Sequence, residues 1–274
     1  MNGIVTRLRQ HPDAPRWNHA ATDRLAATDR AALGRFAEAL ARGRTRREAG
    51  EVPAGVLRWL RGRADKSPHN RRALAGLRPE RDWARIPTMG REDLAVRAHE
   101  VVPDDADLSA MLVYRTAGTT GHALLVPHAA RAVGAYLPFL ELGLRRHGVR
   151  PTFSPDAAGL FLVGAQARTV TYPSSFSYWK GTGFAKLNLN PGDWPSPGSA
   201  ARYFAEFAPP LLTGDPLSFA EMLRQGVKHR PRALVTTAVG LSGGLKRRLE
   251  KAYRCPVIDW YSLTETGPLG YACP

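Results

Sequence analysis

Two short segments of the chain combine residue types that could bind a nucleotide. The first, from Tyr114 to His122, reads Tyr-Arg-Thr-Ala-Gly-Thr-Thr-Gly-His. Small residues and hydroxyls let backbone N–H groups and threonine side chains converge on an anion, and glycine supplies unusual backbone torsions. A polyphosphate is the ligand that such a segment would bind, although the Gly-Lys-Ser/Thr of a Walker loop is missing. A Gly/Thr hairpin between two strands explains this segment equally well.

The second segment, from Asp259 to Gly267, reads Asp-Trp-Tyr-Ser-Leu-Thr-Glu-Thr-Gly and follows an apolar run. At the carboxyl edge of a parallel sheet, an aromatic ring can stack on a base, a threonine hydroxyl can meet a phosphate, and a carboxylate can hold Mg²⁺. A Tyr-x-x-Thr-Glu pattern alone is weak evidence, because Thr-Glu is also a common helix start.

The elements around these segments predict an α/β fold with a largely parallel sheet and flanking helices. A helical, Arg-rich N-terminal region over 1–78 precedes an α/β domain over 79–274. The stretch 172–199 is rich in Pro, Gly, Ser and aromatic residues, so it is expected to be a long irregular excursion. Apolar runs predict strands at 111–115, 124–126, 159–163, 211–213, 233–236 and 257–260, and periodicity predicts helices at 129–146, 217–228 and 242–253.

Composition places the chain among packed globular proteins. It has 274 residues, of which 43% are hydrophobic and 23% charged, which argues against disorder. The longest apolar stretch is far shorter than the ~20 residues of a membrane span. The N-terminus lacks the pattern of a secretory signal, and two cysteines fit a reducing compartment, so we expect a cytoplasmic protein without a membrane partner.

The net charge of +15 favours contact with polyanions. A solvated basic surface explains this charge more simply than a dedicated site does. Nucleic-acid binding stays a third-ranked hypothesis, because no interleaved basic and aromatic module is recognisable.

In this order, the two segments resemble the adenylate-forming (AMP-binding) ligase superfamily, most closely its phenylacetate-CoA ligase-like branch. Residues 86–94 look like the family's segment before the phosphate loop, and residues 212–216 resemble its Gly-Thr/Tyr-Pro turn. Ser242 precedes Tyr261 at the spacing of the family's adenine-loop serine. The resemblance spans residues 79–274 and implies the N-terminal portion of such an enzyme.

The resemblance implies activation of a carboxylic acid as an acyl-adenylate with ATP and Mg²⁺, followed by transfer to a thiol such as CoA. Thr264 would bond the α-phosphate or the carboxylate, and Glu265 would ligate Mg²⁺. The helix after the phosphate loop and the aromatic stretch offer an acyl pocket, although core packing explains each of its residues more simply. The implied sets are Thr116, Ala117, Gly118, Thr119, Thr120 and Gly121 for phosphates, Thr237, Ala238, Val239 and Tyr261 for adenine, and Tyr136, Phe139 and Trp179 for the acyl group.

Three departures from the family pattern accompany this resemblance. His122-Ala123 stands where the family has Lys-Pro, Ser262 replaces a glycine, and Val239-Gly240 replaces Glu-Pro. The family also continues into a mobile C-terminal domain, so we expect these residues alone to turn over poorly and to need a separate C-terminal domain or a homodimer. The alternative is a non-catalytic nucleotide- or partner-binding module derived from this fold. The sequence names neither the acid nor the thiol acceptor.

Overall fold

The computed structural model describes residues 3–43, 52–116 and 124–274. The chain divides into two compact units, the first formed by Met1–Ala41 with Gly134–Pro274 and the second by Arg42–Val133. The expected division at residue 78 does not coincide with a boundary between these units.

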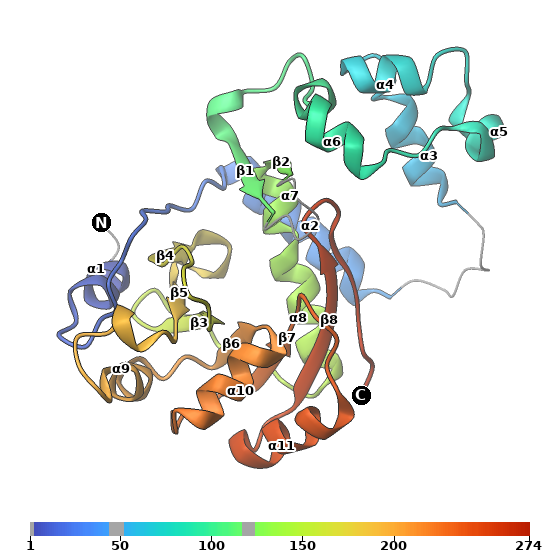
Figure 1. Cartoon of the computed structure of the whole chain (residues 1–274). Helices are drawn as coiled ribbons and strands as arrows, with labels where there is room; N and C mark the ends of the chain where they lie inside the picture. The colour runs from blue at the N-terminus through green and yellow to red at the C-terminus, as the bar shows by residue number, and fades with distance from the viewer. Residues whose placement is uncertain (1–2, 44–51, 117–123) are drawn as a thin grey trace. The chain divides into compact units, whose positions relative to one another are not determined.

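The first unit contains a mixed but mostly parallel sheet (Figure 1). Its five central strands are parallel, and the two outermost strands pair antiparallel to their neighbours. The predicted α/β class is therefore confirmed. Within the described residues the order is β4 (Tyr172–Phe176), β5 (Thr182–Asn188), β3 (Ala158–Gly164), β6 (Leu211–Gly214), β7 (Ala233–Thr236), β8 (Val257–Leu263) and β9 (Gly267–Tyr271).

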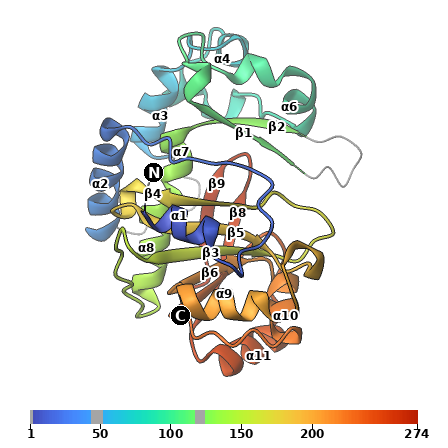
Figure 2. The same cartoon turned by 90° about the vertical axis from the view of Figure 1, so that its left-hand side faces the viewer.

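Helices cover both faces of this sheet, which explains why its central strands are continuous apolar runs. On one face, α1 (Gly3–Gln10), α9 (Ser199–Phe207), α10 (Pro216–Arg224) and α11 (Gly243–Tyr253) enclose a core centred on Phe161, which is fully buried. On the other face, α8 (Tyr136–Arg146) packs on Trp260 and its neighbours. Figure 2 shows α9, α10 and α11 together on their side of the strands.

Local signals in the sequence fix where α10 and α11 begin. The Asp215 carboxylate accepts a hydrogen bond from the Ser218 N–H at 2.9 Å, and the Ser242 hydroxyl accepts one from the Leu245 N–H at 3.2 Å. Just before this first cap, Gly214 ends β6, where a Cβ would lie 2.5 Å from the Val163 carbonyl oxygen. Only glycine fits this close approach of β6 to β3.

The stretch 172–199 corrects one expectation. It is not an irregular excursion, because it holds β4 and β5 and the short helices η4 (Ser177–Trp179) and η5 (Pro191–Asp193). The glycines and the proline in this stretch favoured the prediction of a loop. In the structure β4 and β5 form a hairpin, and β5 pairs with β3. The predicted helix over 129–146 begins one residue later, because β2 continues to Ala129. It is also divided at Ala135 into α7 (Ala130–Gly134) and α8.

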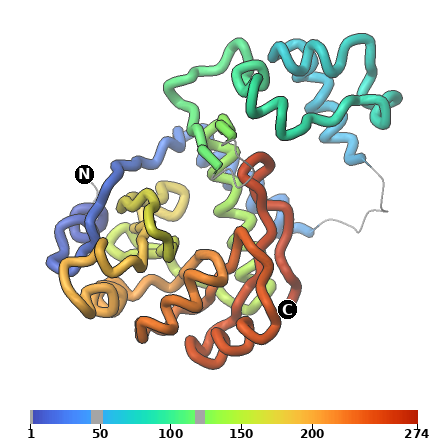
Figure 3. Tube along the Cα trace, viewed as in Figure 1, coloured from blue at the N-terminus to red at the C-terminus, as the bar shows by residue number. Residues whose placement is uncertain are grey.

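The N-terminal part of the chain contains several helices. Besides α1, the first unit contains α2 (Ala27–Ala41), which packs against α8. Figure 3 shows the chain entering this unit beside α1 and ending beyond β9, at different ends of the sheet. Among the described residues, no helix is both long enough and apolar enough to span a membrane.

The second unit combines short helices with a two-stranded antiparallel hairpin. The hairpin confirms the predicted strand at 111–115, and its second strand begins one residue later than predicted. Its elements are α3 (Ala54–Arg61), α4 (Pro68–Ala73), α5 (Pro79–Asp82), η1 (Trp83–Arg85), α6 (Arg91–Arg97), η2 (Ala98–Val101), η3 (Leu108–Ala110), β1 (Met111–Arg115) and β2 (Leu125–Ala129).

Candidate nucleotide-binding site

The carboxyl ends of β6, β7 and β8 meet at one edge of the sheet in the first unit. Thr236 at the end of β7 pairs in register with Gly214 of β6 on one side and with Asp259 of β8 on the other. The Thr236 hydroxyl lies 3.3 Å from Asp259 Oδ1. Ligands of open α/β sheets bind at this edge, so the segments that leave these strands form the candidate site.

The segment after β7 is the one that the family resemblance assigns to adenine. The Thr237 N–H donates to the Gly214 carbonyl oxygen at 3.0 Å, and the Val239 N–H donates to the Thr237 carbonyl oxygen at 3.0 Å. Between them, Ala238 has a φ of +74°. Val239 is 51% exposed, so its side chain and the neighbouring backbone are accessible to a ligand.

The second segment forms the tight end of the β8–β9 hairpin. Tyr261 lies within β8 and is 62% exposed, whereas Val257, Ile258 and Trp260 of the same strand are buried. Thr264, Glu265 and Thr266 make the turn between the strands, and all three are exposed. Side chains alternate along a strand, so Tyr261 projects from the face opposite to that of Trp260.

A hydrogen bond joins the two segments. The hydroxyl oxygens of Thr237 and Ser262 are 3.2 Å apart. The Ser262 hydroxyl is also hydrogen-bonded to that of Tyr136, at the start of α8. Burial raises the pKa of the Tyr136 phenol and the bond to Ser262 lowers it by less, so this phenol stays protonated at neutral pH.

The residues expected in an acyl pocket take part in the core on the α8 side of the sheet. Tyr136 and Phe139 pack against Trp260, with ring centroids 6.4 and 5.1 Å away. Trp179 is 2% exposed, stacks on Phe153 at 4.0 Å and lies in the same core. An acyl-binding role for the three residues stays a prediction.

Most of the expected phosphate loop lies outside the described residues, since these resume at Leu124 after Thr116. Thr116 itself follows β1 in the second unit, where its N–H donates to the Leu124 carbonyl oxygen at 3.0 Å. Its hydroxyl accepts a hydrogen bond from the Leu124 N–H at 2.9 Å. Phosphate binding by this segment therefore stays a prediction.

The exposed turn 264–266 fits the way in which proteins hold a magnesium–nucleotide complex. Mg²⁺ usually keeps several water ligands and is bound by one or two carboxylates together with substrate phosphates. Glu265 offers one such carboxylate between two threonine hydroxyls. Within the described parts of the chain, no group of three or more His, Cys, Asp or Glu residues could hold a metal ion by itself.

The chain matches known proteins in structure but not in sequence. No protein-family model matches the chain, and no curated protein matches its sequence. An open-conformation crystal structure of 2-hydroxyisobutyryl-CoA ligase, in complex with 2-HIB-AMP and CoA, matches 86% of the chain with a TM-score of 0.51 and 18% identity. The chain has the fold of the N-terminal portion of adenylate-forming CoA ligases. It spans 50% of that ligase's length.

Two further matches are weaker. A post-adenylation structure of the same ligase, with R3-HIB-AMP, gives a TM-score of 0.49 at 19% identity over 89% of this chain and 51% of the ligase. The anthranilate CoA ligase AuaEII, in complex with anthranoyl-AMP, gives 0.41 at 18% identity over 73% of this chain and 36% of that enzyme.

Sequence reasoning missed two polar residues that hold separate segments of the first unit together. Ser262 was noted only as a departure from the family pattern, and its bonds to Thr237 and Tyr136 connect segments that lie far apart along the chain. Asn188 at the end of β5 is fully buried, and its side-chain amide donates to Asp193 Oδ2 at 2.7 Å. No sequence pattern distinguishes either residue from an ordinary polar residue.

Proposed function

We propose that the chain supplies the nucleotide-binding portion of an AMP-forming acyl ligase. Such an enzyme activates a carboxylic acid as an acyl-adenylate and passes the acyl group to a thiol such as CoA. The observation that carries the proposal is the 3.2 Å contact between the Thr237 and Ser262 hydroxyls. It joins the two segments that the resemblance assigns to adenine at the carboxyl edge of the sheet, beside the exposed Tyr261 ring.

In this proposal, the chain's own residues bind and orient the nucleotide. Tyr261 stacks on one face of the adenine, while the backbone of 237–239 lies along the base edge. Thr264 donates a hydrogen bond to the α-phosphate, and Glu265 holds Mg²⁺, which neutralises phosphate charge. A carboxylate oxygen of the acid attacks the α-phosphorus, the bond to the bridging oxygen breaks, and pyrophosphate leaves. A thiolate then attacks the acyl carbon and AMP leaves.

This chemistry requires positioning and charge neutralisation rather than a protein nucleophile. The exposed turn 264–266 and the segment 237–239, of which Ala238 and Val239 are exposed, offer backbone groups and hydroxyls that suit that requirement. The proposal names the acid and the thiol acceptor, and any partner domain, only by class.

A non-catalytic nucleotide-binding module is the second candidate. It is favoured by His122 in place of the family's lysine and by Val239 in place of its glutamate. Without that lysine the nucleotide loses a fixed cation near its terminal phosphate, which weakens catalysis more than it weakens binding of the base.

Calorimetry with Mg-ATP and with a non-hydrolysable acyl-adenylate analogue tests the shared part of both candidates. Exchange of labelled pyrophosphate into ATP, across a panel of aromatic and aliphatic carboxylic acids, then separates them. The exchange assay is made on the chain together with a C-terminal domain, because these residues alone are expected to turn over poorly. In that form, binding with acid-dependent exchange supports the ligase, whereas binding without exchange supports the module. A chain that binds neither ligand contradicts both.

A further inference from the structure

Ser262 occupies a position from which it touches both segments of the candidate site. It lies on β8, on the face that points toward α8, and its hydroxyl meets those of Thr237 and Tyr136. The three hydroxyls come from the end of β7, from β8 and from the start of α8. A glycine at position 262, as in the family pattern, would provide neither bond.

The first of these bonds ends at a strained turn. The Val239 N–H to Thr237 carbonyl bond spans three residues, and the central residue, Ala238, has a positive φ of +74°. These features match the rarer and strained of the two γ-turn forms. A non-glycine residue keeps such a conformation only where its surroundings hold it in place. The hydroxyl of Thr237, at the first position of the turn, is anchored by Ser262.

The second bond ends at a ring that supports the β8–β9 turn. The Tyr136 ring stacks on Trp260 at 6.4 Å with an interplanar angle of 27°. A Cβ added at Gly267 would lie 3.5 Å from Tyr136 Cε2. Gly267 directly follows the turn 264–266 and has a φ of +77°, so the ring packs against the base of this turn.

We propose that Ser262 is a positioning residue that fixes the strained 237–239 turn and the 264–266 turn in one arrangement before the nucleotide arrives. The inference rests on the proposed function, because it names what preorganises that same site. Ordering these turns in the free protein lowers the entropy cost of binding. Ser262 acts through Thr237 and Tyr136 and does not itself touch the reacting atoms.

Hydrogen–deuterium exchange on the free 274-residue chain tests the coupling without any ligand. Ser262→Ala and Ser262→Gly remove the hydroxyl, and Ser262→Thr retains it. Thr237→Val removes the partner hydroxyl while keeping the side-chain shape. Exchange of the backbone over 237–241 is expected to accelerate about tenfold in the hydroxyl-free variants, consistent with the loss of a typical hydrogen bond, and to stay at the wild-type rate in Ser262→Thr.

A matched control comes from β4. Ser175 is a partly buried serine in the same sheet, and the described part of the chain offers no hydrogen-bond partner to its hydroxyl. Ser175→Ala makes the same chemical change away from the site and is expected to leave exchange over 237–241 and 261–267 unchanged. Equal exchange in wild type and in both Ser262→Ala and Thr237→Val overturns the inference.

Calorimetry with Mg-ATP then tests whether the contacts of Ser262 affect nucleotide binding. The dissociation constant is expected to rise about three- to tenfold in Ser262→Ala, within the range for one lost hydrogen bond, and to stay within twofold in Ser262→Thr and Ser175→Ala. A wild-type chain that does not bind Mg-ATP contradicts the proposed function, while the exchange experiment still decides the coupling. Wild-type affinity retained in Ser262→Ala overturns the inference alone.

Discussion

At the scale of single residues, Tyr261 is the most informative side chain of the candidate site. A large aromatic residue with 62% exposure contributes little to the core, so its removal should change binding more than folding. Leu269 on the neighbouring strand β9 is similarly exposed, at 49%, and has no assigned role.

Tyr261→Ala is expected to weaken Mg-ATP binding by about tenfold or more, because stacking of one base on an aromatic ring is worth about 1–3 kcal/mol. Its melting temperature should stay near that of the wild type. Calorimetric titration beside thermal unfolding measures both quantities, with Leu269→Ala as the control. Similar affinities for the wild type and both variants would argue against stacking on this ring.

A second residue-scale feature is the carboxyl of Glu141 on α8. Its Oε1 accepts a hydrogen bond from the Trp179 indole N–H at 2.8 Å. Burial raises the pKa of this carboxyl, while the indole and the Arg145 guanidinium act in the opposite direction with smaller effect. The folded chain therefore holds this proton more tightly than the unfolded chain does.

The sign of the pH dependence follows from that difference. The contribution of Glu141 to the free energy of unfolding is fully present below the unfolded pKa of the carboxyl and is lost as the pH rises through the folded one. Glu141→Gln keeps an acceptor for the indole but cannot ionise, so its stability relative to the wild type should increase between pH 4 and pH 7. Urea unfolding across this range measures the difference. Glu250→Gln on α11 is the control, and parallel pH profiles for the wild type and Glu141→Gln would contradict the expectation.

At the scale of elements, the sequence predicted those strands whose apolar runs are long enough to be buried on both faces. The bounds expected for β7 are those observed, and β3, β6 and β8 extend each expected run by a few residues at most. The expected helices at 217–228 and 242–253 correspond to α10 and α11, although neither Asp215 nor Ser242 was predicted as a cap.

The strand β5 could not be predicted, because one of its residues, Gly183, is determined by contact with α1, which is far away in the sequence. Gly183 reads as a strand breaker, yet a Cβ there would lie 2.7 Å from Ile4 Cγ1 and 3.1 Å from Leu8 Cδ1. The glycine makes room for α1 on the sheet, a contact between residues far apart in sequence. The Thr237–Ser262–Tyr136 contacts were unpredictable for the same reason, since local patterns carry no information about tertiary neighbours.

One element-scale prediction concerns the end of α11. Arg254 terminates this helix in the left-handed conformation, with a φ of +54°, and its N–H donates to the Glu250 carbonyl oxygen. A left-handed conformation costs a residue with a Cβ roughly 1–2 kcal/mol, a cost that glycine avoids. Arg254→Gly is therefore expected to stabilise the chain by up to about 1 kcal/mol.

The matched control for that change lies inside the same helix. Arg248→Gly removes the same side chain and charge from an exposed helical position, where glycine costs about 1 kcal/mol. Chemical unfolding should therefore move the midpoint in opposite directions for the two variants. Destabilisation by both would show that the arginine side chain, and not the backbone conformation, dominates at position 254.

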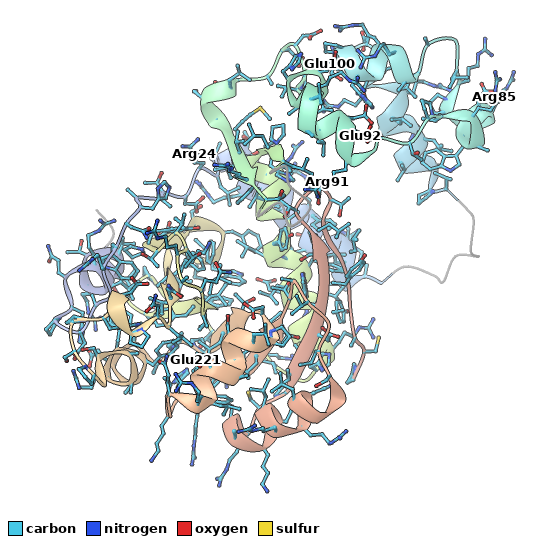
Figure 4. The ribbon with its side chains drawn as sticks, viewed as in Figure 1. Arg24, Arg85, Arg91, Glu92, Glu100 and Glu221 are labelled. Atoms are coloured by element: carbon cyan, nitrogen blue, oxygen red, sulfur yellow. The ribbon has the colours of Figure 1, made fainter. Side chains whose placement is uncertain are left out.

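At the scale of the whole molecule, the positive charge is unevenly distributed within the first unit. The segments 142–155 and 222–249 contain no Asp or Glu. Parts of both lie at the amino edge of the sheet, where an Arg232 Nη1–H donates to the Arg150 carbonyl oxygen at 2.9 Å. Figure 4 shows long side chains with nitrogen at their tips projecting outward from α10 and α11, near the labelled Glu221.

Lys228 and Arg230 carry part of this charge and precede β7, at the opposite edge of the sheet from the candidate site, so their effect on a nucleotide is a long-range one. The strand β7 and its flanks separate Lys228 and Arg230 from Thr237 by roughly 20 Å. Electrostatic interactions decay over about 30 Å at 0.01 M salt but only about 8 Å at 0.15 M. The amino edge should therefore attract the ATP anion at low salt and have almost no effect on it at physiological salt.

The double variant Lys228→Glu/Arg230→Glu distinguishes long-range electrostatic attraction of Mg-ATP, which changes the association rate, from direct contact with the bound nucleotide, which also changes the dissociation rate. Both side chains are exposed on the loop between α10 and β7, so the exchange should not disturb the fold. In stopped-flow measurements, the association rate constant for Mg-ATP is expected to fall severalfold at 0.01 M salt and to match the wild type at 0.15 M, with an unchanged dissociation rate at both. An equal loss at both salt concentrations would mean that these residues lie near the bound nucleotide, and the nucleotide would then have to sit at the amino edge instead of beside Tyr261.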